Sequence, residues 1–186
     1  MASVADDREL VTRAAGGDES AFRAIVERHE QALARTITAM LGPGDDADDV
    51  GQETFVRFFG ALPRFRGDAQ LGTYLTRIAV NLCCDTLERR RRRARWLTMG
   101  GSDDEPAIAA PDETEALELA ERKEAVRRAV ASLDAKHQAI VVLRILEERS
   151  TREVAEILGI PEGTVMSRLK RALEKLAVRL GPEWRP

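Results

Sequence analysis

The sequence predicts an all-α protein: two small helical domains joined by a flexible acidic linker, with a helix-turn-helix in the C-terminal domain. Two observations support this prediction. The 186 residues are rich in Ala, Leu, Arg and Glu and only 4% are aromatic, and the abundant side chains lose little rotamer freedom in a helix. Apolar residues also recur at helical spacing along most of the chain, but not between Trp96 and Glu113.

The change of composition in the middle of the chain sets the predicted domain boundaries. Residues 96–114 contain paired glycines, two prolines and many acidic side chains, a composition typical of a linker. We therefore expect a first domain over residues 1–95, a linker over residues 96–114 and a second domain over residues 115–186.

Charge is distributed unevenly along the chain. The formal net charge is -3, which argues against a uniformly basic nucleic-acid-binding protein. Positive charge is nevertheless concentrated in an unbroken arginine run at residues 89–93 and again in the C-terminal helical segment, whereas acidic residues gather at 45–49 and 103–121. The distribution predicts local nucleic-acid contacts on an acidic protein.

Several functional classes are excluded. No stretch approaches the roughly 20 apolar residues that cross a bilayer, and the N-terminus is acidic where a secretory signal is basic, so we expect a cytoplasmic protein without membrane insertion. There is no phosphate-binding loop, metal cluster or nucleophile set, and we expect surface polar roles for His29 and His137. We therefore expect no metal, no cofactor, no catalytic residue and no enzymatic activity.

The two cysteines are adjacent. Cys83 and Cys84 lie inside an apolar helical stretch, a spacing that suits neither an ordinary disulfide nor a set of zinc ligands. We interpret them as core or helix-face residues, with redox sensing as the alternative.

Turn residues separate the predicted helices of the first domain. A short first helix ends at paired glycines, Asp18 suits the N-cap of the second, and residues 42–44 (Gly-Pro-Gly) end it. Acidic residues 45–49 open a third helix, where a helix N-terminus presents unpaired N–H groups. A fourth, long helix runs from about Leu71 into the arginine run. The third helix has apolar positions that we expect to face the core: Val50, Phe55, Phe58 and Phe59.

Residues 151–176 (TREVAEILGIPEGTVMSRLKRALEKL) fit a helix-turn-helix. Ala155 lets the partner helix approach closely, and Gly159 supplies the positive φ of the tight turn. The second helix of the pair has an apolar stripe and an opposite polar face suited to the major groove. The alternative is an amphipathic helix pair with a solvated basic face. The candidate residues for recognition of an upstream DNA element are Thr164, Ser167, Arg168, Lys170 and Arg171.

Two segments of the first domain, DDADDVGQETFVRFF at residues 45–59 and FRGDAQLGTYLTRIAVNLCCDTLERRRR at residues 65–92, resemble extracytoplasmic-function (ECF) sigma factors of bacterial RNA polymerase. The helix-turn-helix is similar to the second domain of these proteins. The resemblance covers about residues 8–95 and 115–180. It implies that the protein binds core RNA polymerase and promoter DNA, directs promoter-specific initiation and is controlled by an anti-sigma factor.

The resemblance assigns a docking role to the third helix. Its DVGQE segment is similar to the family helix that binds the clamp coiled coil of the polymerase large subunit, which nominates Asp49, Gln52 and Glu53. Complementary charge suits such an acidic helix to a basic partner helix. The alternative is that carboxylates only cap and solubilise the helix, which we expect for Asp45 and Asp46.

The segment that follows resembles the family loop and helix start that capture unstacked bases of the melted promoter element. A protein that binds the bases of an opened duplex needs stacking surfaces, hydrogen-bonding groups and cations close together. The alternative for Tyr74 is that it is an aromatic residue of the core. The candidates for the melted element are Phe65, Arg66, Asp68, Gln70, Tyr74, Arg77 and Asn81. The candidates for phosphate contact, with a solvated helix end as the alternative, are Arg89, Arg90, Arg91, Arg92 and Arg93.

The chain departs from the family pattern at a few positions. Gly72 stands where a larger polar residue is usual, and Leu133, Asp134 and Gln138 replace a Leu-Pro pair and a later Arg. We expect the changes at Asp134 and Gln138 to alter helix capping and local pairing while leaving the fold intact.

Two other functions fit parts of the sequence. The first is a conventional helix-turn-helix regulator whose N-terminal domain senses a ligand or dimerises. The second is an adaptor that binds polymerase but contacts no DNA. The co-occurrence of the clamp-like helix, the base-capturing loop and the helix-turn-helix favours a sigma factor over both.

Overall fold

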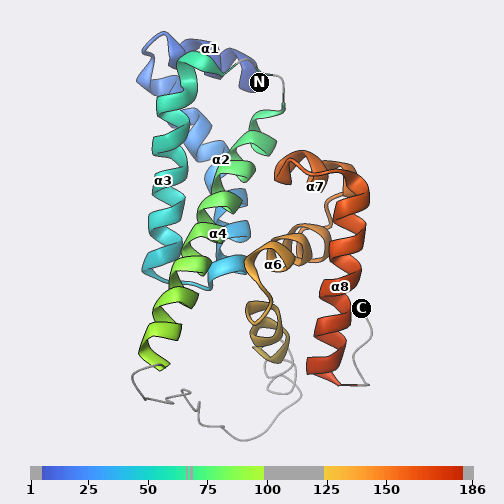
Figure 1. Ribbon diagram of the computed structural model, residues 1–186. Coiled ribbons are helices and arrows are strands. Elements are labelled where there is room, and N and C mark those ends of the chain that lie inside the picture. Colours follow the sequence, from blue (N-terminus) through green and yellow to red (C-terminus); the bar gives the residue numbers. More distant parts are fainter. Residues whose placement is uncertain (1–5, 66, 68, 99–123, 182–186) are drawn as a thin grey trace, which may run out of the picture.

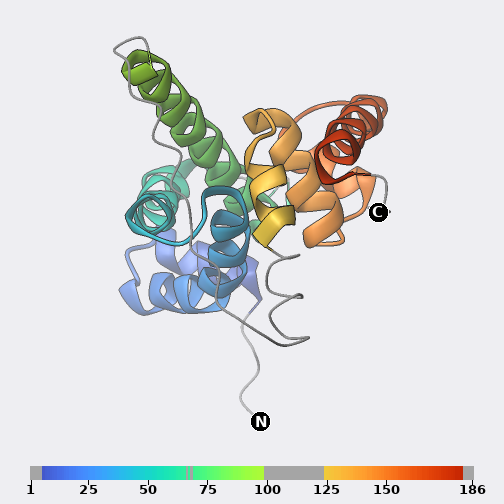
Figure 2. The same ribbon diagram turned by 90° about the horizontal axis from the view of Figure 1, so that it is seen from below.

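The computed structural model describes residues 6–65, 67, 69–98 and 124–181 (Figure 1). Within these ranges every regular element is a helix, which confirms the all-α prediction. The helices form two groups that lie side by side, one before and one after the predicted linker (Figures 1 and 2). Most of that linker, predicted for residues 96–114, lies outside the described residues.

The first group of helices contains three long α-helices that pack against one another. The elements are α1 (Asp7–Ala15), α2 (Glu19–Leu41), α3 (Asp45–Ala61), the 3₁₀ helix η1 (Leu62–Arg64) and α4 (Leu71–Thr98). Helix α1 packs on α2 and η1, while α2, α3 and α4 contact one another in pairs. Their shared core includes Ile25, Ile37, Phe58 and Leu75, none of which is more than 1% exposed.

Local hydrogen bonds fix the ends of α2. The Asp18 carboxylate accepts hydrogen bonds from the backbone N–H groups of Ser20 (3.0 Å) and Ala21 (3.2 Å), which confirms the predicted N-cap. The Ser20 hydroxyl and the Arg13 guanidinium also donate to this carboxylate and hold the pKa of Asp18 well below its usual range. Gly42, with φ +76°, ends the helix.

The second group of helices contains the helix-turn-helix. Its elements are a helix over residues 124–131, α6 (Ala135–Val141), the π-helical turn η2 (Val142–Leu146), α7 (Thr151–Leu158) and α8 (Glu162–Leu180). Helices α7 and α8 with the turn between them confirm the predicted motif. Its core includes Ile140, Leu143, Val154, Val165 and Leu176, each at most 2% exposed.

Both ends of α7 are tightly specified. At its N-terminus the Ser150 hydroxyl accepts from the Glu153 N–H (3.2 Å), while the Glu153 carboxylate accepts from the Ser150 N–H (2.8 Å), a reciprocal capping box. The Ser150 hydroxyl also donates to the Glu153 carboxylate (2.6 Å), and this bond, followed by the one from the Ser150 N–H, lowers the pKa of Glu153. At the C-terminus Gly159 adopts φ +64°, as the tight turn requires. The capping box fixes where α7 begins, and the turn at Gly159 sets the direction in which α8 leaves it.

The two groups pack against each other along α4. Helices α6 and α7 contact α4, and η2 contacts α2. Side chains donate to backbone carbonyls across this boundary: the Gln138 amide to Met40 (2.6 Å) and the Arg91 guanidinium to Leu133. The second domain therefore covers one side of α4, and the C-terminal end of α4 projects beyond its neighbours (Figure 2).

Burial corrects the expectations for three aromatic side chains. The expectation that Phe59 faces the core is wrong, because this residue is 59% exposed; its ring packs edge to face with that of Phe22, with the centroids 5.1 Å apart. The expectation of surface polar roles for His29 and His137 is confirmed for the polar interactions but not for the exposure. Their side chains are only 15% and 16% exposed, and each lies against the carboxylate of an aspartate.

Candidate functional site

The residues nominated for polymerase docking share one exposed face of α3. Asp49 and Gln52 are exposed and the Glu53 side chain is 46% exposed, and spacings of three and four residues place all three on the same side of a helix. The Glu53 carboxylate accepts a hydrogen bond from Arg57 Nε one turn later (2.8 Å). The structure thus brings the three residues together as an acidic stripe on α3, and this helix is separated from the second domain by α4 (Figure 1).

The two acidic residues expected only to cap α3 lie in its first turn. Asp45 is exposed. The Asp46 carboxylate accepts from Arg90 Nε at 2.6 Å and so ties the N-terminus of α3 to α4. Asp46 is therefore engaged within the protein, whereas the acidic stripe is not covered.

Aromatic rings form the centre of the candidate site for the melted element. The Phe65 and Tyr74 rings meet edge to face with centroids 4.9 Å apart, and both contact the buried ring of Phe58, at 5.9 and 6.1 Å. Phe65 and Tyr74 are themselves only half-buried. Tyr74 therefore packs on the core, as the alternative interpretation expects, while part of its surface is open to solvent.

The remaining nominated residues of this site are spread over the loop and α4. Gln70 and Asn81 are exposed. The Arg77 guanidinium reaches the second domain, where Nε donates to the Ile157 carbonyl (3.3 Å) and Nη2 to the Glu156 carbonyl. Arg77 thereby satisfies carbonyls in the last turn of α7, which have no partners within that helix. Arg66 and Asp68 lie outside the described residues.

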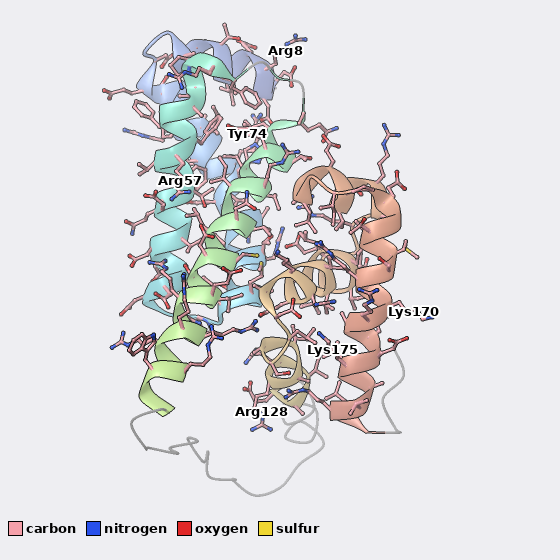
Figure 3. The ribbon with its side chains drawn as sticks, viewed as in Figure 1. Arg8, Arg57, Tyr74, Arg128, Lys170 and Lys175 are labelled. Atoms are coloured by element: carbon pink, nitrogen blue, oxygen red, sulfur yellow. The ribbon has the colours of Figure 1, made fainter. Side chains whose placement is uncertain are left out.

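Two arginines that the sequence analysis did not nominate border the same site. Arg57 and Arg64 line a surface hollow of about 710 Å³ together with Phe65, Tyr74 and Arg77. Figure 3 shows Arg57 on α3 and Tyr74 on the neighbouring α4. Their position in the sequence could have identified them, because both come shortly before Phe65.

The five consecutive arginines of α4 differ in their contacts. Arg89 donates to the Thr86 hydroxyl (2.9 Å), Arg90 to Asp46 and the Leu41 carbonyl, and Arg91 to the Leu133 carbonyl. By contrast, Arg92 and Arg93 are exposed and make no hydrogen bond or ion pair within the part of the chain that the structure describes. These two lie on the projecting end of α4, where a DNA backbone could approach.

The recognition face of α8 is open to solvent. Ser167, Lys170 and Arg171 are exposed, whereas Thr164 and Arg168 are half-buried on its flanks. The Ser167 hydroxyl donates to the Thr164 carbonyl (3.1 Å). Figure 3 shows Lys170 on the side of α8 that faces away from α4. The buried stripe of the same helix consists of Val165, Leu169, Ala172 and Leu176.

Neither cysteine has the environment of a reactive thiolate. Burial raises the pKa of the Cys83 thiol to about 12 and that of the Cys84 thiol to about 11. Cys83 is fully buried in the core, and the half-buried Cys84 has its Sγ 3.8 Å from the Ala135 carbonyl. This environment favours the structural interpretation of both residues.

Two other kinds of feature are absent from the described residues. None of their helices is long and apolar enough to cross a membrane. The same residues contain no group of three or more His, Cys, Asp or Glu side chains placed to hold a metal ion.

Two family models match the chain. Residues 25–93 match the model described as Sigma-70 region 2, and residues 123–176 match the model described as Sigma-70, region 4. The first match contains the acidic stripe and the aromatic site, and the second contains the helix-turn-helix.

Relatives are similar to the chain over most of its length. The ECF RNA polymerase sigma-E factor of Escherichia coli is 33% identical over 188 residues, which covers 98% of each chain. The ECF RNA polymerase sigma factor SigW of Bacillus subtilis is 30% identical over 173 residues, which covers 88% of this chain and 91% of the relative.

Solved structures have the same fold. CnrH, solved in complex with the cytosolic domain of CnrY, matches with a TM-score of 0.67 at 33% identity and covers 96% of this chain and 99% of its own. The sigma factor RpoE of Bartonella quintana, solved with the anti-sigma factor NepR, matches with a TM-score of 0.62 at 22% identity, covering 88% and 98%. This chain therefore belongs to the ECF family of RNA polymerase sigma factors, which bind core RNA polymerase and direct promoter-specific transcription initiation.

Proposed function

We propose that the two domains of this sigma factor divide promoter recognition between them. The second domain binds the upstream promoter element as a duplex through the exposed face of α8. The first domain docks on core polymerase through Asp49, Gln52 and Glu53 and holds the melted element beside Phe65 and Tyr74. The observation that carries this proposal is that the α3 stripe and the α8 face are separate, exposed surfaces on opposite sides of the molecule (Figure 1).

The chemistry of each surface fits its proposed ligand. An acidic stripe with an amide donor complements a basic helix of the polymerase and favours rapid, oriented docking. On α8, the Ser167 hydroxyl and the Arg171 guanidinium can reach base edges in a major groove, and Lys170 can reach phosphates. All of these are binding interactions, so the protein acts without covalent chemistry. Its site of action is the cytoplasm, where its polymerase works.

The sigma factor is further proposed to be controlled by an anti-sigma factor. Support comes from CnrH, a protein 33% identical to this chain that was solved with the cytosolic domain of CnrY bound. Purification of the chain from its own cells, followed by identification of bound proteins, tests this control. Recovery without any partner, together with full constitutive activity in those cells, would contradict it.

Replacement of recognition residues tests the role of α8. Arg171→Ala should lower the affinity of the holoenzyme at particular upstream bases by about 1–3 kcal/mol if the guanidinium makes a bidentate contact, and Ser167→Ala should lower it by less. The measurement is promoter binding across a set of templates with single base changes in the upstream element. A loss that is uniform across all templates would show that these residues contact phosphates only.

A further inference from the structure

The exposed face of α8 contains an apolar side chain among its polar ones. Met166 is 52% exposed and lies in the second turn of α8, which begins at Glu162. Gly163 and Lys170 are three residues before it and four residues after it, spacings that place all three on one side of a helix. Both neighbours are exposed, and among the described residues nothing lies within 4 Å of the position that a Cβ of Gly163 would occupy. Met166 therefore lies on an uncovered side of α8, as Lys170 does (Figure 3).

A hydrogen bond from α7 restrains this side chain. The hydroxyl of Thr151, the first residue of α7, donates to Met166 Sδ across the turn of the helix-turn-helix (3.5 Å). A methionine side chain has several rotatable bonds, and immobilising a flexible side chain on binding costs conformational entropy. Because the contact with Thr151 restrains the thioether before a ligand arrives, it reduces that cost.

The position of Met166 in the helix-turn-helix is one that can meet DNA bases. The second helix of this motif lies in the major groove, and its N-terminal residues contact base edges. Polar side chains bind the donors and acceptors of those edges, whereas the C5 methyl group of thymine is bound by apolar contact. The Met166 thioether has no donor and is only a weak acceptor, so its chemistry suits the methyl group rather than the polar groups.

We propose that Met166 recognises the C5 methyl group of a thymine in the upstream promoter element. This inference rests on the proposed function, because it takes α8 to be the helix that binds this element and adds a residue that determines which sequence is bound. The contact differs in kind from those of Ser167 and Arg171, which reach polar groups of the base edges. It favours thymine over the other three bases at one position of the element, because only thymine has this methyl group.

The test uses holoenzyme reconstituted from core polymerase and the full chain, together with the fragment of a genomic pool that it transcribes most strongly. In a series of such fragments, each thymine of the upstream element is replaced singly by deoxyuridine, which removes only the methyl group. For the parent protein, one of these replacements should weaken binding by about two- to fivefold, as expected for the loss of one buried methyl group. Met166→Ala should weaken binding of the unmodified fragment by a similar factor and should bind it equally well with and without that methyl group.

Further variants separate this contact from a general loss of apolar surface. Val178→Ala is the matched control, because Val178 is 87% exposed near the C-terminal end of the same helix; it should leave the affinity and the response to deoxyuridine unchanged. Met166→Leu remains apolar and should keep most of the response, whereas Met166→Gln has a similar length but a polar end and should lose it. Circular dichroism and binding to core polymerase are measured for every variant, so that misfolding is recognised.

The outcomes distinguish the inference from the proposed function. If Arg171→Ala lowers the affinity at particular upstream bases while Met166→Ala keeps the parent's response to deoxyuridine, the methionine contact is refuted and the role of α8 stands. The contact is also refuted if no single replacement by deoxyuridine weakens binding of the parent protein. If neither Arg171→Ala nor Met166→Ala changes promoter binding while core binding is normal, the role of α8 is refuted as well.

Discussion

The arginines at the end of α4 show that identical neighbours in sequence can have different roles. The five consecutive arginines in the sequence predict one shared role, contact with DNA phosphates. In the structure, Arg90 and Arg91 instead donate hydrogen bonds to other parts of the protein. Arg92 and Arg93 are exposed on the projecting end of α4. Only the three-dimensional partners distinguish them, because the sequence repeats the same side chain.

This division predicts two different mutant phenotypes. Replacement of Arg92 and Arg93 together by Ala should reduce the salt slope of duplex promoter binding by about 0.9 per lost phosphate contact and leave the free energy of unfolding within about 0.5 kcal/mol of the parent. Arg90→Ala should instead lower the free energy of unfolding by about 1 kcal/mol, since the Arg90 guanidinium donates hydrogen bonds to the Asp46 carboxylate and the Leu41 carbonyl. An unchanged salt slope in the double variant would assign these residues to solvent.

The cysteines give a second prediction at the level of single residues. Because burial raises the pKa of Cys83 to about 12 and that of Cys84 to about 11, almost no thiolate exists at neutral pH, and the thiolate is the reactive form. The native protein should therefore react with iodoacetamide far more slowly than the same protein in denaturant, as measured by mass spectrometry. Rapid modification of the native protein, or formation of a sulfenic acid at low peroxide concentration, would contradict this prediction and support a redox-sensing role.

At the level of elements, the helix-turn-helix is the part that the sequence predicts best. Gly159 and the apolar stripe of α8 obey local rules, because a tight turn needs a positive φ and an amphipathic helix needs a period near 3.6. Phe59 could not be predicted in this way. It belongs to a cluster of phenylalanines on α3, and which of them is buried depends on where α2 and α4 lie.

Glycine replacements test the turn directly. Gly159→Ala should lower the free energy of unfolding by about 1 kcal/mol or more, because Ala is strained at φ +64°. Gly163→Ala is the matched control within α8, where an added Cβ meets nothing within 4 Å and the backbone is not left-handed. It should be neutral or stabilise by up to about 1 kcal/mol in urea unfolding. Equal effects of the two replacements would contradict the assigned turn geometry.

The N-cap of α6 carries a pH-dependent contribution. Burial of Asp134 raises its pKa, but hydrogen bonds from the His137 side chain and backbone and from Lys175 outweigh burial and lower the pKa to about 2. Because this lies below the unfolded value of about 3.9, the stabilisation is complete above about pH 4 and is lost as the pH falls towards 2.

Asp134→Asn isolates this contribution, because Asn also caps helices but does not titrate. The difference in free energy of unfolding between the parent and this variant should shrink between about pH 4 and pH 2. Its size should stay below about 1 kcal/mol, since the Asp134 side chain is 45% exposed and water screens its pairs. A difference that does not change with pH would contradict the assignment.

At the level of the whole molecule, the packing of the two domains is the feature that the sequence could not supply. Arg77 was nominated for promoter contact from its place in a motif, yet its guanidinium donates to carbonyls of α7, about eighty residues away. No local pattern encodes such a contact. The order of elements and the identity of the two domains, by contrast, follow from helical periodicity and turn residues.

The Arg77 contact predicts a measurable effect on this packing. Arg77→Ala should lower the free energy of unfolding by about 1–2 kcal/mol, because it leaves carbonyls of α7 without donors, and should enlarge the radius of gyration in small-angle X-ray scattering. Arg23→Ala, an exposed position on α2, is the control for the loss of charge. An unchanged radius and stability would show that the domains are held by their apolar contacts alone.

This chain is proposed to confer promoter specificity on core polymerase by docking through α3. The most direct test is in vitro transcription from a pool of genomic promoter fragments, using sigma-free core polymerase with and without the protein. We predict specific new transcripts that disappear when Gln52 and Glu53 are replaced by Ala, while the fold of the variant is unchanged by circular dichroism. If the polymerase makes no new transcripts although the protein alone binds discrete DNA sites, this role as a sigma factor is contradicted.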